Sequence, residues 1–169
     1  MSRTTPTLSP ADPGATDDEL AGQPIGYWSG AAHRAVIGYI RDAMARIDVT
    51  QPQWWTLNRV DVDGPGPTRE DVAAAIGELA GGDHEVFRVV DQLLHRGWLS
   101  AGDDGRLRLT DTGRTAKARV KNLVTDLRTQ VHEGVPDEEY VAALKVLRRM
   151  IRNVEDATRD ASQVRQRSL

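Results

Sequence analysis

The chain of 169 residues contains no cysteine, which excludes disulfides, thiol redox switching and zinc sites with thiolate ligands. Aromatic residues make up only 5% of it, and helix-forming residues dominate, so a mainly α-helical protein is expected. No apolar run approaches the roughly 20 residues that a membrane span needs, so we expect no membrane contact. The N-terminus shows no basic start followed by an apolar core, so no signal peptide is expected and the cytoplasm is the expected location.

Motifs for catalysis are also missing. The histidines are scattered without paired spacing, and there is neither a glycine-rich phosphate loop nor a nucleophile elbow. Asp61 and Asp63 begin like a calcium loop, but Val72 occupies the position of the closing glutamate. We therefore expect a protein that is not an enzyme and that holds no metal ion and no cofactor. The four histidines are His33, His84, His95 and His132.

The net charge of -3 is unevenly distributed. Four acidic residues and one basic residue fall in residues 1–24, which leaves 21 of each sign in the rest of the chain. Residues 106–121 hold six basic residues against Asp111 alone. A local basic patch of this kind is sufficient to bind phosphates, although a solvated helix face explains the charge pattern equally well.

The most informative stretch is residues 68–110. Residues 68–71, Thr-Arg-Glu-Asp, have the form of a capping box, and apolar residues at helical spacing follow until Gly81-Gly82. Asp83 is expected to cap a second helix, whose apolar stripe is Val86, Val89, Val90, Leu93 and Leu94. After Gly97, two short apolar segments flank Gly-Asp-Asp-Gly at residues 102–105, which predicts a hairpin.

A helix, a turn, a helix and a two-stranded wing form a winged helix-turn-helix, an order that most often reads double-stranded DNA. Arg88 is the best candidate for a bidentate contact to guanine, and His84 and Gln92 are candidates for a base edge or a phosphate. Phe87 lies on the same face, where it either meets a thymine methyl group or packs back on the preceding helix. The wing adds Arg106 and Arg108, which period-two spacing puts on one face of the strand.

Helices are expected on both sides of this stretch. Residues 24–48 form an amphipathic helix that must pack on another helix, and Thr50 caps the next one, which carries Trp54 and Trp55. Because adjacent residues point about 100° apart on a helix, one tryptophan is expected in the core, while the other lines a cleft or fills a corner. A ligand pocket is expected between the flanking helices and the winged helix-turn-helix, and its candidate residues are Tyr27, Trp28, His33, Trp54 and Trp55.

The C-terminal helix carries apolar residues in alternating steps of four and three, which is a heptad seam of two repeats. Ordinary intrachain packing would explain so short a seam, but a two-fold partner would cover the first and the last helix together. The expected dimerisation residues are Val36, Ile40, Tyr140, Leu144, Leu147, Ile151 and Val154.

Residues 24–156 resemble the MarR family of bacterial transcription regulators. The resemblance rests on Pro-Gln-Trp at residues 52–54, on Val-Val-Asp-x-Leu leading into Arg-Gly-Trp-Leu at residues 96–99, and on Leu-Thr-Asp-Thr-Gly at residues 109–113. It implies a homodimer, a pseudo-palindromic operator and a small aromatic effector that releases the protein from DNA.

Together these patterns predict a mainly α fold with a small β-wing. We expect a disordered tail at 1–23, a helical dimerisation region at 24–49 and 111–160, a winged helix-turn-helix at 50–110 and a frayed end at 161–169. The expected function is a homodimeric transcription regulator that reads DNA, with repression as its expected mode. A winged helix that binds a protein instead of DNA is the alternative, favoured by the acidic start of the second helix and by a weak wing tip.

Overall fold

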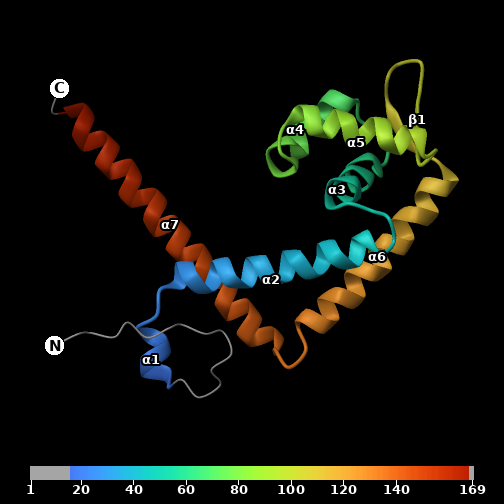
Figure 1. Ribbon diagram of the computed structural model, residues 1–169. Coiled ribbons are helices and arrows are strands. Elements are labelled where there is room, and N and C mark those ends of the chain that lie inside the picture. Colours follow the sequence, from blue (N-terminus) through green and yellow to red (C-terminus); the bar gives the residue numbers. More distant parts are fainter. Residues whose placement is uncertain (1–15, 168–169) are drawn as a thin grey trace, which may run out of the picture. The chain divides into compact units, whose positions relative to one another are not determined.

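The computed structural model describes residues 16–167, with side chains as far as residue 162. Its fold is mainly α-helical with one two-stranded antiparallel sheet, as the sequence predicted (Figure 1). The chain divides after Leu127 into two compact units. The elements are α1 (Asp17–Ala21), α2 (Ile25–Ala45), α3 (Gln51–Val60), α4 (Arg69–Ala80), α5 (Asp83–His95), β1 (Leu99–Ala101), β2 (Leu107–Leu109), α6 (Asp111–Val131) and α7 (Asp137–Arg167).

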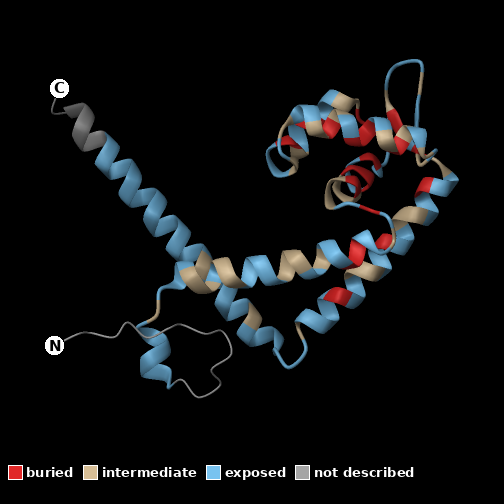
Figure 2. Ribbon diagram, in the orientation of Figure 1, coloured by how far each residue is buried: buried red, intermediate tan, exposed pale blue. Residues whose placement is uncertain are grey.

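The main core lies between α3, α4, α5 and the hairpin, where Figure 2 shows most of the buried segments. The apolar stripe predicted for α5 faces inward, with Val86, Val89, Val90 and Leu93 each at most 1% exposed. Leu57 of α3 and Val72 of α4 meet them in the same cluster. Because helix faces of this kind are stable only when covered, the three helices and the wing form one packing unit.

Local signals explain where α3, α4 and α5 begin. Thr68 and Asp71 form the predicted capping box at α4, and Thr50 and Gln53 form another at α3. The prediction that Asp83 caps α5 is wrong. Gly82 is the N-cap residue, without a side-chain bond, and Asp83 is already helical. Gly81 and Gly82 have φ of 97° and 112°, a left-handed path that residues other than glycine rarely adopt, so the turn is made by backbone conformation.

The wing is a short hairpin in which Leu99 pairs with Leu109, Ser100 with Arg108 and Ala101 with Leu107. Leu107 and Leu109 are buried, whereas Arg108 between them is exposed, which is the period-two alternation expected of a strand on a core. The N–H of Leu107 also donates to the carbonyl of Pro67 at 2.8 Å. The loop before α4 therefore holds the wing from its outer side.

One junction joins α5, the wing and α6. The hydroxyl of Thr110 donates to the carbonyl of Gly97 at 2.6 Å and accepts from the N–H of Gly113 at 3.0 Å. A Cβ on Gly113 would lie 1.9 Å from the carbonyl oxygen of Trp98, so only glycine allows this approach. The Arg-Gly-Trp-Leu and Leu-Thr-x-x-Gly segments thus meet in space, which gives their spacing a physical reason.

A second, smaller cluster lies beside the first. Met44 of α2, Val49 of the following turn and Val120 of α6 are buried together, and Trp54 packs against them. No residue of α2 before Ala43 is buried, so the rest of the predicted amphipathic face is half-covered or exposed. None of the described helices is long and apolar enough to cross a bilayer.

The two ends differ from the sequence prediction. Residues 1–15 of the predicted disordered tail lie outside the described residues, but Asp17–Ala21 form a short helix because Thr16 and Glu19 make a capping box. At the other end, α7 continues as far as Arg167, into the segment that the sequence predicted to fray. Alanine, glutamine and arginine in this segment are strong helix formers, which outweighs its polarity.

Candidate nucleic-acid interface

The outward face of α5 carries the side chains predicted to read DNA. His84 and Arg88 are exposed, and Gln92 is half-buried. Phe87 is also half-buried and packs against the main core, with the guanidinium of Arg69 5.8 Å from its ring centroid. Of the two roles that the sequence left open for Phe87, the structure favours packing on α4.

Arg88 is held by an acidic neighbour on its own helix. Its Nε donates to the carboxylate of Glu85 at 3.1 Å, and its Nη2 makes a second bond to the same group. These bonds lower the pKa of Glu85 and raise the pKa of Arg88, because each charge stabilises the other. Both side chains therefore stay ionised at neutral pH. The pair is exposed to solvent, so it contributes little to stability and can exchange for another anion.

A second acidic residue on this face is also paired. Asp91 accepts a 2.7 Å bond from Nη2 of Arg69, which ties the middle of α5 to the first turn of α4. The outward face of α5 therefore carries both signs of charge. Its acidic groups are neutralised by arginines in the described structure, so repulsion of phosphates is smaller than the residue count suggests.

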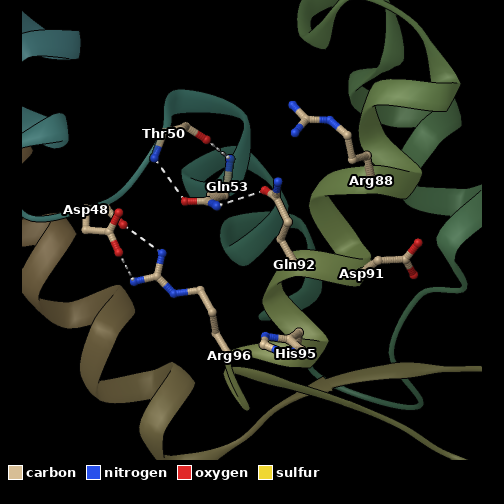
Figure 3. Close-up of a pocket in the computed structure, with 8 residues that line it drawn as sticks. All are labelled: Asp48, Thr50, Gln53, Arg88, Asp91, Gln92, His95 and Arg96. Carbon is tan, nitrogen blue, oxygen red and sulfur yellow. Dashed lines mark hydrogen bonds and ion pairs between the residues drawn. The ribbon is translucent and has the colours of Figure 1, made fainter.

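The N-terminus of α3 reaches the same face. Gln53 is 5% exposed, its Oε1 accepts from the N–H of Thr50 at 3.0 Å, and its Nε2 donates to Oε1 of Gln92 at 3.2 Å. Between α3 and α5 lies an open groove of about 710 Å³ (Figure 3). Its lining residues are Asp48, Thr50, Gln53, Arg88, Asp91, Gln92, His95 and Arg96.

Arg96 closes one end of this groove. Its guanidinium donates to the carbonyl of Asp48 at 2.7 Å, lies 3.1 Å from the Asp48 carboxylate, and stacks 3.9 Å from the centroid of Trp98. Asp48 has a φ of 56°, so the arginine supports a strained turn between α2 and α3. Arg96 is thus engaged in the fold, although sequence reasoning treated it only as part of a family motif.

The two wing arginines differ from each other. Arg106 is half-buried, donates to the carbonyl of Gly66 at 2.7 Å and lies 3.6 Å from Asp104, so its guanidinium anchors the wing to the preceding loop. Arg108 is exposed on the strand face. Of the pair predicted to contact phosphates, Arg108 has the better placement.

The basic run that continues into α6 is partly neutralised. Arg114 lies 3.3 Å from Asp111, and Lys117 is paired with Asp61. Arg119 and Lys121 are exposed on α6. Lys117 therefore ties α6 to the end of α3, whereas Arg119 and Lys121 leave positive charge on the surface of α6.

The five residues proposed for a ligand pocket do not form one group in the described structure. Tyr27 and Trp28 meet edge to face with ring centroids 5.5 Å apart, whereas Trp54 packs with Met44 and Val120. Met44 lies sixteen positions after Trp28 on α2, a distance of roughly 24 Å at about 1.5 Å per residue. His33 is exposed and Trp55 is half-buried. The pocket stays a prediction.

Within residues 16–167, no group of three or more His, Asp or Glu side chains is arranged to hold a metal ion. Three groups that sequence reasoning missed are Gln53, Arg69 and Arg96, which bind Gln92, Asp91 and Asp48. The sequence predicted that Thr50 caps α3, but the partners of these three side chains lie 22 to 48 residues away in the chain, where spacing gives no signal.

Comparisons with known proteins agree with this fold. No family model and no curated protein matches the sequence. Among solved structures, the reduced form of MarR from E. coli is 19% identical, with a TM-score of 0.60 over 80% of this chain and 98% of that one. The Mycobacterium tuberculosis MarR family protein Rv2887, in complex with DNA, is 17% identical, with a TM-score of 0.60 over 76% and 98%.

A third similar structure is the transcriptional repressor CouR bound to p-coumaroyl-CoA. It is 26% identical, with a TM-score of 0.61 over 81% of this chain and 97% of that one. The fold expected from the sequence resemblance is therefore confirmed: the described chain has the winged-helix fold of MarR-family regulators.

Proposed function

We propose that this chain, which has the fold of the MarR-family regulators, is a homodimeric transcription regulator that reads double-stranded DNA with α5. The observation that carries the proposal is the exposed face of α5, where His84 and Arg88 stand out from a helix locked into the core by its other face. The wing adds the exposed Arg108. A rigid helix with a bidentate donor is the arrangement that major-groove recognition needs.

Dimerisation is the second part of the proposal. In the C-terminal unit, Leu144, Ile151 and Val154 of α7 are 41%, 57% and 66% exposed, and they belong to one heptad seam. Tyr140 at the start of the seam contacts His132, with ring centroids 4.4 Å apart. A second copy would cover this stripe and give the protein two recognition helices for two half-sites of a pseudo-palindromic operator.

The direct test is a gel shift with the upstream region of the protein's own gene across a salt series. A regulator is expected to give a discrete complex whose affinity falls steeply with salt, because phosphate contacts release counterions. A matched fragment with a shuffled sequence is the control. Equal binding to both fragments, or no binding at low salt, contradicts the proposal.

We further propose repression relieved by a small aromatic effector. The support is the p-coumaroyl-CoA bound to CouR, a thioester with an aromatic acyl group, together with the half-exposed Tyr27 and Trp28 on α2. p-Coumaroyl-CoA is the first probe. It is expected to quench tryptophan fluorescence and to weaken the DNA complex, because a ligand shifts an equilibrium only by binding one state more tightly. Saturating probe without either effect contradicts this part.

A second function is favoured by one observation. Both acidic groups on the α5 face are paired with arginines, so the face as it stands resembles a charged protein contact surface. A winged helix that binds a protein partner would show no gel shift at low salt. It would instead retain a partner through α5, and that retention would be lost when Arg88 is reversed to glutamate.

A further inference from the structure

Gln53 is a buried polar side chain with both ends of its amide engaged, and one of its partners lies on the proposed reading face. It is 5% exposed, and it connects the capping turn of α3 to Gln92 of α5 (Figure 3). Buried amides that bridge two helices fix the orientation of what they contact. The bond to Gln53 therefore determines which end of the Gln92 amide can contact a base.

The direction of this chain of hydrogen bonds is determined by its first member. The backbone N–H of Thr50 can only donate, so the Gln53 atom facing it at 3.0 Å must be the oxygen. The other end of Gln53 is then its NH₂ group, which only donates. Its partner at 3.2 Å must therefore be the oxygen of Gln92. No choice between oxygen and nitrogen remains at either amide.

With its oxygen turned toward Gln53, Gln92 presents its NH₂ group to the groove beside Arg88 (Figure 3). A glutamine that offers both ends pairs bidentately with adenine, accepting from N6 and donating to N7. One that offers only its NH₂ group favours guanine, whose major-groove edge carries the acceptors O6 and N7 and no donor.

We propose that Gln53 is a positioning residue that sets the base preference of Gln92, an inference that rests on the proposed function. It holds Gln92 as a donor, so that Gln92 selects guanine. Gln53 does not touch DNA itself. Its effect on sequence preference is therefore separate from its effect on affinity. If Gln53 only capped α3, its substitution would leave the preferred base unchanged.

The decisive variant is Gln53→Glu. Glutamate retains the bond from the Thr50 N–H, since an acid at this position of a capping box is favourable. It has no N–H to give to Gln92, so the Gln92 amide must reverse, with its NH₂ group inward and its oxygen toward the groove. The preferred partner then becomes a donor, the N4 amino group of cytosine or the N6 amino group of adenine.

The experiment selects binding sites from a randomised duplex library with the wild-type chain and with Gln53→Glu, followed by affinity measurements on duplexes that differ at the selected position. The wild type is expected to prefer guanine there by about tenfold, and Gln53→Glu to prefer cytosine or adenine by a similar factor. Gln51→Glu is the matched control, because it adds the same charge to the same turn of α3 while its side chain faces Arg41. It is expected to lower affinity without changing the base.

A second variant keeps the test informative if Gln53→Glu folds poorly. Gln92→Glu fixes an acceptor on α5 directly, accepts the bond from Gln53, and is expected to give the same switch to cytosine or adenine. If the wild type selects a motif and Gln53→Glu or Gln92→Glu selects the same one, Gln53 does not position Gln92. That result overturns this inference and leaves the proposed function in place. If the wild type selects no motif, the proposed function itself fails.

Discussion

If the chain reads DNA as proposed, Arg88 is the residue on which recognition would depend most. It stands on the exposed face of α5, opposite the buried valines, and its planar guanidinium matches the two acceptors of guanine. In the described structure that guanidinium is bound to Glu85. Reading a base would therefore mean exchanging Glu85 for the base, and the strength of the Arg88–Glu85 pair would limit the gain in binding free energy.

Arg88→Ala is expected to abolish the preference for the base that Arg88 contacts and leave the fold intact, because the side chain supports no buried contact. The loss corresponds to about 1–3 kcal/mol of discrimination for a bidentate contact. Competition gel shifts with specific and shuffled duplexes measure it, and circular dichroism checks the fold. Arg88→Lys keeps the charge but loses the fork, so it should retain non-specific binding and lose most of the preference. Full preference in either variant would assign the reading face elsewhere.

Glu85→Gln is expected to strengthen DNA binding a few-fold at neutral pH. The bonds from Arg88 lower the pKa of Glu85. The carboxylate is therefore charged at neutral pH and becomes protonated only at a pH below the ordinary pKa of a glutamate. Removing the charge eliminates a competitor for Arg88 and a repulsion of phosphates. Fluorescence anisotropy with a labelled duplex measures the change. Weaker binding would show that Glu85 orients Arg88 toward DNA.

At the scale of single residues, the sequence predicted which side chains are exposed better than it predicted which groups they contact. Alternation identified Arg108 as an exposed wing residue, but the same alternation put Arg106 beside it, whereas Arg106 donates to the carbonyl of Gly66. Arg106 and Gly66 are 40 residues apart, and only the packed fold brings them together. Periodicity reports which face a residue occupies, not which group lies opposite.

Among the elements, the junction of α5, the wing and α6 determines how the wing is held. Thr110 bonds to the end of α5 and to the start of α6, and Gly113 lies against the carbonyl of Trp98. Arg96 extends the same junction to the turn before α3. The wing is thus fixed at its base by side chains that bond to backbone groups, while its tip at residues 102–105 remains exposed or half-exposed.

Gly113→Ala is expected to destabilise the protein by about 1–3 kcal/mol, because the new Cβ would lie 1.9 Å from a backbone oxygen and α6 must shift. Urea unfolding followed by circular dichroism measures this cost. Gly38→Ala in α2 is the matched control, since nothing lies within 4 Å of the added Cβ and alanine is the better helix former, by about 1 kcal/mol. Equal stability of Gly113→Ala and the wild type would remove the steric reason for the glycine.

The elements were predictable because their signals are local. Capping boxes at Thr50 and Thr68, the double glycine before α5 and the Gly-Asp-Asp-Gly turn all act within four residues. The N-cap of α5 was predicted one residue too late, since the backbone path of Gly81 and Gly82 replaced a side-chain cap. The short helix at Asp17–Ala21 was missed because composition outweighed its capping box in the prediction.

At the scale of the whole molecule, the exposed apolar seam of α7 is the surface that a second copy would cover. Its seam residues are largely exposed, and apolar stripes of this kind in a stable protein are usually buried against a partner. Two copies joined through this seam would present two α5 helices to one duplex. The DNA-reading and dimerisation parts of the proposal are therefore linked by geometry but carried by different residues.

Leu147→Glu combined with Ile151→Glu is expected to convert the proposed dimer to a monomer, because buried charges without partners are costly. Light scattering measures the mass. The monomer should bind DNA far more weakly, since each half-site is then bound independently. Arg149→Gln with Asn153→Glu changes the net charge by the same amount on the opposite face of α7, and it should leave the dimer intact. A folded dimer of the seam variant would remove this seam from the interface.

Hydroxyl-radical footprinting of the protein on its selected duplex tests the central claim most directly. A homodimer that reads DNA with α5 should protect two backbone segments related by a two-fold axis, with centres about one helical turn, or 10–10.5 base pairs, apart. Both segments should disappear together in Arg88→Ala. A single protected segment, or no protection at low salt while the protein remains folded, would contradict the claim.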